Sequence, residues 1–257
     1  MIESTHYTQE FYAEQQGGSL SSATTILPLL QEVFHPASVI DVGCGVGHWL
    51  SVWYNQFGVK DIQGVEGPYV TADLLKIPKE LVHFQDLKAP LPIQRRYDLA
   101  MSLEVAEHLP ASFAQQFVKT LTALSDVVLF SAAIPGQEGT YHINEQLPEY
   151  WAALFKAEGY VPVDFIRPQV WGMDEKVAWW YQQNALIYIK ESRLKDFPAL
   201  SDAYLHTNAG YLMRVHPWLY HYKLEILRKT KSFIGFVRWT YLYPVKKFVR
   251  KKLNTQK

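Results

Sequence analysis

The sequence predicts an α/β fold, in which a doubly wound, mostly parallel sheet carries helices on both faces. The first observation is that short apolar runs alternate with helical patterns from about residue 38 to residue 190. This alternation is the order of elements that a parallel sheet with flanking helices requires. The second is that the apolar run ending at Val42 leads into three glycines at alternate positions, Gly43, Gly45 and Gly47. Glycine-rich turns between a buried strand and a helix are typical of ligand-binding α/β domains.

The individual elements follow from their periodicity. Ile26, Leu29, Leu30 and Val33 recur at helical spacing, so we expect a helix that begins at Ser21 or Ser22 and ends near Phe34. Strands are expected near residues 38–42, 61–66, 81–86, 97–103, 126–132, 160–166 and 185–190. Further helices are expected near residues 47–57, 69–76, 111–124 and 149–157.

Composition limits the class of protein. The chain has 257 residues, 48% of them hydrophobic, and is long enough for one large core with a small appendage. Its one cysteine, Cys44, permits no intramolecular disulfide and fits a reducing compartment. The sequence shows neither a signal-peptide pattern nor an apolar stretch of membrane-spanning length, so we expect a cytoplasmic protein. We expect an N-terminal lid over 1–20, the α/β domain over 21–192 and a helical extension over 193–257.

Carboxylates follow successive predicted strands. Asp41 precedes the glycine loop, Glu66 ends the second strand about twenty residues later, and Asp86 closes the third. A carboxylate at the position of Glu66 is suited to bind a ribose diol. The dinucleotide fingerprint would need a glycine in place of His48, so a nicotinamide cofactor is disfavoured.

The G-x-G-x-G loop with Asp41 before it resembles motif I of the class I S-adenosylmethionine (SAM)-dependent methyltransferases. The resemblance covers roughly residues 20–190. It implies a seven-stranded sheet whose last strand is antiparallel, SAM as cofactor and S-adenosylhomocysteine (SAH) as product. The residues that it implies in cofactor binding are Asp41, Gly43, Cys44, Gly45, Gly47, Glu66, Gly67, Asp86, Leu87, Leu103 and Glu104.

A second cluster of polar residues follows the fourth predicted strand. Glu104, Glu107 and His108 have the spacing that places them on one side of a helical turn. Two carboxylates so close repel each other unless a proton or a cation joins them. The loop after the fifth strand carries His142, and both loops emerge at the carboxyl edge of a parallel sheet.

This E-x-x-E-H segment resembles the ubiquinone-biosynthesis O-methyltransferases and the methyltransferases of small-RNA 3′ ends. The resemblance implies that Glu104, Glu107, His108 and His142 bind Mg²⁺ or Mn²⁺, which holds vicinal oxygens of the acceptor, and that Glu107, His108 and His142 act in catalysis. A metal-free alternative also stands, in which Glu104 orients the cofactor and His108 is the general base.

The acceptor is predicted less directly. Arg167, Trp171, Trp179, Trp180, Tyr181 and Gln182 lie between the last two strands, where aromatic and amide groups suit a sugar ring. We expect an O-methyltransferase acting on a small molecule or glycan, namely a saccharide or sugar-bearing intermediate. An RNA ribose or a small phenol is the alternative acceptor, and a non-catalytic SAM-binding scaffold is the alternative class.

The charge of the chain is unevenly distributed. Residues 223–257, the basic tail, hold eleven Lys or Arg residues and one acidic residue, although the whole chain has 25 of each sign. Aromatic residues are interleaved with these cations. The composition predicts peripheral association with an anionic membrane, on the inner surface for a cytoplasmic protein. Docking on an acidic subunit body and binding to nucleic acid are the alternatives.

Overall fold

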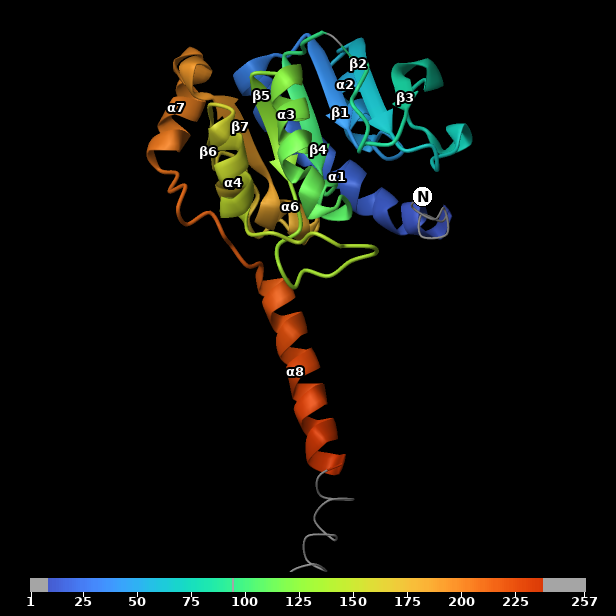
Figure 1. Cartoon of the computed structure of the whole chain (residues 1–257), viewed down its shortest axis with the longest axis vertical. Coiled ribbons are helices and arrows are strands. Elements are labelled where there is room, and N and C mark those ends of the chain that lie inside the picture. The colour runs from blue at the N-terminus through green and yellow to red at the C-terminus, as the bar shows by residue number, and fades with distance from the viewer. Residues whose placement is uncertain (1–8, 94, 238–257) are drawn as a thin grey trace, which may run out of the picture. The chain divides into compact units, whose positions relative to one another are not determined.

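The first compact part of the protein is built around one sheet. The computed structural model describes residues 9–93 and 95–237 and separates into two units, residues 1–214 and 215–257. The sheet of the first unit has seven strands in the order β3-β2-β1-β4-β5-β7-β6 (Figure 1). Neighbouring strands from β3 to β5 are parallel, whereas β7 is antiparallel to both β5 and β6. The predicted seven-stranded, mostly parallel sheet with an antiparallel last strand is therefore confirmed.

The strands lie where the apolar runs predict them. Most positions of the central strands are buried, because helices cover both faces of a doubly wound sheet. The third strand is shorter than predicted. The strands are β1 (Ser38–Val42), β2 (Asp61–Glu66), β3 (Val82–Phe84), β4 (Leu99–Leu103), β5 (Val127–Ser131), β6 (Tyr160–Val163) and β7 (Leu186–Lys190).

Alternate strand residues point into two hydrophobic cores. Val39 belongs to the core on the face covered by α1 (Gln9–Phe34), α2 (His48–Asn55) and α6 (Trp179–Asn184). Its neighbour Ile40 belongs to the core on the opposite face, under α3 (Ala114–Leu124) and α4 (Pro148–Ala157). This period of two is the consequence of the β pleat.

The first helix begins earlier than predicted. It starts at Gln9, so Ser21 and Ser22 lie inside it and do not cap its N-terminus. The Ser21 hydroxyl donates to the carbonyl of Lys176 (2.7 Å), and the Ser22 hydroxyl accepts from the amide of Ala178 (2.9 Å). Serine is typical of helix caps because its hydroxyl bonds backbone groups, but here it bonds a distant loop. The part of the predicted lid from residue 9 onward is therefore helical, and residues 1–8 lie outside the described residues.

The helix predicted over 69–76 was wrong. Only the short 3-10 turn Ala72–Leu74 forms there. The amide of Lys76 donates to the carbonyl of Val46 in the glycine loop (2.8 Å). Ile77 is buried against Gly47, where an added Cβ would lie 3.0 Å from its side chain. This segment bonds the glycine loop in place of its own helical turn.

The sheet unit extends beyond residue 192, where the composition suggests its end. A 3-10 turn (Glu191–Asp196) and α7 (Pro198–Leu205) belong to it. Leu200 and Leu212 are almost completely buried in its cores, which explains why the unit continues to Arg214.

The second unit, residues 215–257, is described as far as the end of α8 (Pro217–Val237). Pro217 is its first helical residue, a position that needs no amide proton. Residues 238–257 of the basic tail lie outside the described residues. Within the described ranges, no helix is both long and apolar enough to cross a membrane.

Candidate active site

A cavity of about 350 Å³ lies at the carboxyl ends of the parallel strands. That edge is where α/β folds bind ligands, because the loops after neighbouring strands converge there. Most residues predicted to bind the cofactor line this cavity, together with His108: Asp41, Gly43, Cys44, Gly45, Glu66, Gly67, Asp86, Leu87, Leu103 and Glu104. Gly47, Glu107 and His142 are not among its lining residues.

The glycine loop needs glycine for two different reasons. Gly43, Gly45 and Gly47 all have positive φ, at 85°, 55° and 87°. Side chains are strained in this region of backbone conformation. At Gly43 an added Cβ would also lie 2.4 Å from Val105, whereas at Gly45 nothing lies within 4 Å of that position. The loop is thus closely packed on one side and open on the other.

Glu66 joins the ends of β1 and β2. Its carboxylate accepts hydrogen bonds from the amides of Gly45 (2.5 Å) and Gly67 (2.7 Å). Burial raises the pKa of Glu66, while hydrogen bonds from Gly67, Tyr69 and Gly45 oppose that shift. A buried carboxylate at this strand end is the acceptor that a ribose diol needs.

Asp41 presents the opposite situation. It lines the cavity and is buried, yet within the described residues its Oδ1 atom has no hydrogen-bond partner. Burial, and secondly the charge of Glu66, hold the pKa of Asp41 well above its ordinary value. An unpaired buried carboxyl oxygen is costly unless a ligand satisfies it. A cationic group of a ligand would have the right charge to pair with this oxygen.

The cavity also has a wall that sequence reasoning did not assign to the cofactor. It is formed by Ser19 of α1, Trp49 of α2, and Trp180 and Tyr181 of α6. Trp49 and Tyr181 pack edge to face with ring centroids 5.1 Å apart. No short motif marks these residues, because they come from three distant helices.

The other residues predicted to contact the acceptor, Arg167, Trp171, Trp179 and Gln182, do not line the cavity. Arg167 is buried and pairs with Asp164 through two hydrogen bonds of 2.8 Å. Gln182 is buried and bonds the amide of Gly172 and the carbonyl of Val177, both at 2.7 Å. Sequence position alone cannot separate these structural residues from Trp180 and Tyr181.

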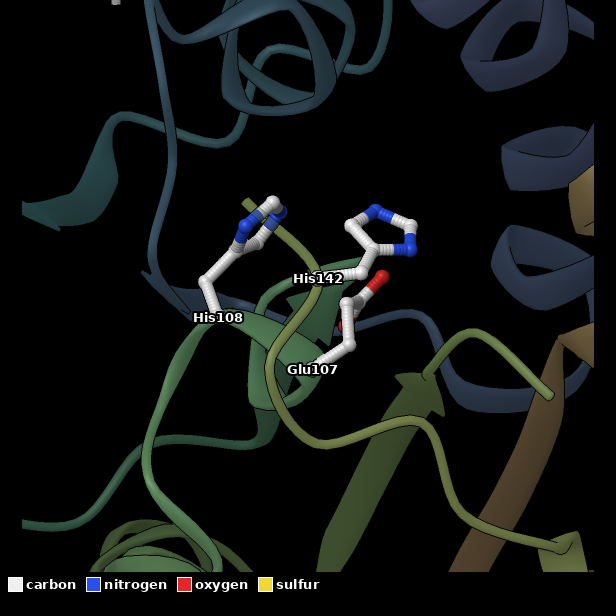
Figure 2. Close-up of side chains that lie close together, drawn as sticks. All are labelled: Glu107, His108 and His142. Carbon is white, nitrogen blue, oxygen red and sulfur yellow. The ribbon is translucent and has the colours of Figure 1, made fainter. Parts of the chain in front are cut away.

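Beside the cavity, three predicted ligands come together. One ligand atom each from Glu107, His108 and His142 lies within 4.8 Å of the others (Figure 2). Glu107 and His108 lie on the 3-10 turn Ala106–His108, and His142 lies on the loop after β5. Two backbone hydrogen bonds hold that loop in place, because the amides of Ile143 and Asn144 donate to the Glu107 carbonyl (2.9 and 3.0 Å). We call these three residues the Glu–His–His triad.

Each imidazole of the triad is oriented through its Nδ1 atom. Nδ1 of His108 lies 3.2 Å from the carbonyl oxygen of Tyr141, which can only accept a hydrogen bond, so Nδ1 is the donor. Nδ1 of His142 lies 3.0 Å from Oε1 of Glu145. In a neutral ring the Nε2 atom then carries the lone pair. Histidines that bind metal ions usually donate their other nitrogen to a carbonyl or carboxylate in this way.

Glu104, the fourth predicted ligand, lies close to Glu107 but is not one of the three residues of the triad. Its carboxylate accepts hydrogen bonds from the amides of Gln137 (2.9 Å) and Asn184 (3.1 Å). Its backbone φ is 56°, an uncommon value for a residue with a side chain. Its amide nitrogen donates to the carbonyl of Ser131 at 3.0 Å. Among the described residues the candidate metal group therefore comprises three of the four predicted ligands.

Glu107 carries a buried carboxyl group whose pKa is strongly raised. It is completely buried, and within the described residues neither carboxylate oxygen has a hydrogen-bond partner. Burial, and then the charge of Glu104, raise the pKa of Glu107 well above its ordinary value. Nearby backbone groups of Ala133 and of Glu107 itself oppose this shift only in part. The site therefore requires either a proton or a cation at Glu107.

Residues 12–168, more than half of the chain, match a family described as a methyltransferase domain. No curated protein matches the chain.

Several solved structures are similar to the chain. The methyltransferase domain of a bacterial Hen1 is 20% identical, with 67% of this chain and 98% of that chain covered and a TM-score of 0.47. Magnesium protoporphyrin IX methyltransferase from Synechocystis PCC 6803, with bound SAH, is 16% identical, with 72% and 89% covered and a TM-score of 0.49. The amino pentose methyltransferase CalS10 from Micromonospora echinaspora, with bound SAM, is 14% identical, with 72% and 98% covered and a TM-score of 0.49.

The family match extends from α1 to the start of α5 (Arg167–Val170), and so includes the glycine loop, Glu66 and the Glu–His–His triad. The chain belongs to the methyltransferase domain family, as a class I enzyme that uses SAM as its methyl donor.

Proposed function

We propose that this methyltransferase acts on a hydroxyl of a vicinal diol, carried by a saccharide or sugar-bearing intermediate, with Mg²⁺ or Mn²⁺ bound by Glu107, His108 and His142. The observation that carries the proposal is the buried Glu107 carboxyl, which has no hydrogen-bond partner within the described residues. Two imidazoles with ligand atoms within 4.8 Å accompany it. Carboxylate oxygen and imidazole nitrogen are suitable ligands for these cations.

The state of His108 favours a ligand over a general base. Burial, and secondly the charge of His142, lower the pKa of His108 to about 4. The ring is then neutral at physiological pH, as metal binding requires. A general base works best with a pKa near the working pH, which is well above this value. Together with the fixed Nδ1 atoms, this supports the metal-binding alternative of the two that the sequence leaves open.

The residues divide the work between two adjoining sites. When bound, SAM supplies an electrophilic methyl group, and the cation lowers the pKa of a coordinated hydroxyl. Asp41 and Glu66 bind and orient the methyl donor in the cavity. His108 belongs to the triad and lines the cavity, so it connects the acceptor site to the methyl donor.

A diol is the acceptor that this arrangement favours. A cation with six coordination positions and three protein ligands has positions left for two acceptor oxygens. Trp180 and Tyr181 add aromatic surface to the same cavity, which suits the apolar face of a sugar ring. An RNA ribose or a catechol offers a similar pair of oxygens, so these acceptors form separate arms of the test.

The metal site is tested first by Mn²⁺ titration with EPR detection, on protein saturated with SAH. We expect one tight site, weakened by about 100-fold or more in His108→Ala and His142→Ala, since changes outside the ligand set alone cost 10–100-fold. The matched control is His206→Ala, which removes an exposed histidine on the C-cap of α7. Absence of a tight site, or equal weakening by the control, would overturn the metal assignment.

The acceptor is tested with SAM carrying a labelled methyl group. We expect transfer to a sugar with a cis diol, dependence on Mn²⁺ or Mg²⁺, and much slower transfer to each monodeoxy analogue. Equal rates with the diol and its deoxy analogues would refute the diol. Preferred transfer to RNA 3′ ends or to catechol would assign the activity to the alternative acceptors.

A further inference from the structure

The C-terminal part of the chain carries a positive charge that has no role in the proposed active site. The basic tail, residues 223–257, contains eleven Lys or Arg residues and only Glu225 as an acid. Residues 1–222 contain 14 basic and 24 acidic residues. The first four cations of the tail, Lys223, Arg228, Lys229 and Lys231, lie on α8. Such a concentration of one sign indicates a polyanionic partner.

The same helix exposes large apolar side chains. Trp218, Tyr222, Ile226 and Phe233 are 51%, 41%, 37% and 65% exposed. Their spacing of four, eight and fifteen residues from Trp218 places them along one side of the helix. The rings of Trp218 and Tyr222 stack with centroids 5.3 Å apart and an interplanar angle of 13°. We call the three aromatic residues among them, Trp218, Tyr222 and Phe233, the aromatic stripe of α8.

Cations and exposed aromatic residues on one helix are the combination that an anionic lipid surface binds. Tryptophan and tyrosine rings lie at the boundary between headgroups and acyl chains, and lysine and arginine bind the acidic headgroups. Nucleic acid accounts for the cations and for stacked rings, but not for the exposed aliphatic residues Ile226 and Leu227.

We propose that α8, through its cations and its exposed aromatic residues, docks this methyltransferase on the surface of an anionic membrane. The cations supply a long-range attraction that salt screens, and the aromatic stripe supplies a shorter-range contribution that salt affects little. Docking is independent of the proposed diol chemistry, because none of the residues involved belongs to the cavity or the triad.

The test is co-sedimentation of the full chain with vesicles of phosphatidylcholine containing increasing fractions of phosphatidylglycerol. We expect binding to increase with the anionic fraction and to decrease between 0.1 M and 1 M salt, as the screening length falls from about 10 Å to about 3 Å. Pure phosphatidylcholine vesicles should bind weakly.

Two variants separate the contributions of charge and of aromatic residues. Changing Lys223, Arg228, Lys229 and Lys231 to glutamine should weaken binding to anionic vesicles by about two to three orders of magnitude. Changing Trp218, Tyr222 and Phe233 to alanine should weaken binding while the salt dependence remains. The matched control changes the exposed body lysines Lys79, Lys119, Lys156 and Lys195 to glutamine and should bind like the wild type.

Unchanged SAH affinity in every variant would show that the protein remains folded. The other outcomes decide between the possible partners. Equal binding to neutral and anionic vesicles, or equal loss in the body-lysine control, overturns the proposal. Binding to a single-stranded RNA oligonucleotide without vesicle binding would assign the tail to nucleic acid. Absence of binding to both vesicles and RNA would favour docking on a protein surface. Either of these last two results would overturn the membrane proposal.

Discussion

Replacement of Glu107 by glutamine should make the metal-free protein more stable and remove its response to metal. The wild-type carboxyl is completely buried and lacks a hydrogen-bond partner among the described residues. Its pKa is raised well above the ordinary value, first by burial and then by Glu104. Glutamine has nearly the same shape and carries no charge, so it removes the cost of ionisation without opening a cavity.

The sign and size follow from proton linkage. Above a pH of about 4.3 the unfolded chain releases the Glu107 proton while the folded protein retains it. The free energy of unfolding of the wild type therefore falls as pH rises, by at most about 1.4 kcal/mol per pH unit, until the pH exceeds the folded pKa. The advantage of Glu107→Gln should therefore grow as pH rises above about 4.3, by at most about 1.4 kcal/mol, or roughly 3–6 °C in Tm, per pH unit.

The assay is thermal unfolding of both proteins at several pH values, with and without Mn²⁺. At 100 times its Kd, Mn²⁺ should stabilise the wild type by about 2.7 kcal/mol and have little effect on the variant. Glu191→Gln, which changes an exposed carboxylate, should show neither trend. A stability difference that does not vary with pH would refute the uncharged state of Glu107, and equal stabilisation by Mn²⁺ would place the metal elsewhere.

Three other substitutions test parts of the site. In Gly43→Ala the new Cβ would lie 2.4 Å from Val105 at a φ of +85°, so thermal unfolding should show a loss of about 2–4 kcal/mol together with weaker SAH binding. Glu66→Gln removes the charged acceptor proposed for the ribose, and calorimetry should show SAH affinity reduced roughly 10–100-fold. In Gly139→Ala the new Cβ would lie 2.4 Å from Nε2 of His142, so EPR should show about tenfold or more weaker Mn²⁺ binding with SAH affinity unchanged.

Gly43→Ala has a control in the same chain, and each of the other two substitutions has an outcome that would contradict it. Gly58 also has a positive φ, at 70°, but nothing lies within 4 Å of its Cβ position, so Gly58→Ala should cost less than Gly43→Ala. If SAH binds equally well to Glu66→Gln, the ribose contact lies elsewhere. If Gly139→Ala leaves Mn²⁺ affinity intact, His142 is not a ligand.

Local sequence determined the positions of the strands along the chain and the conformation of the glycine loop. An apolar run long enough for a strand predicts a buried strand, and three alternating glycines after it predict a turn with positive φ, because glycine adopts positive φ without strain. Asp41, Glu66 and Asp86 follow such runs directly, so parallel pairing alone brings them to one edge. These parts were predictable because the interactions responsible are close in sequence.

Other features depended on residues far apart in the sequence. Ser22 lies inside α1, where its hydroxyl bonds Ala178, and residues 69–76 form only a 3-10 turn, beyond which the Lys76 amide bonds Val46. Among the described residues the candidate metal group comprises three of the four predicted ligands, and the amides of Gln137 and Asn184 bind the fourth, Glu104.

The sequence by itself determined the family, the glycine loop and the identity of the polar residues after β4. Only the tertiary structure decided which polar side chains of the loops after β4 and β5 lie together. His142 joins Glu107 and His108 because backbone hydrogen bonds from Ile143 and Asn144 tie the loop after β5 to the turn after β4. Burial then leaves the Glu107 carboxyl without a hydrogen-bond partner among the described residues. The physical reason is that burial and long-range hydrogen bonding, which set the charge state of this site, have no signature in the local sequence.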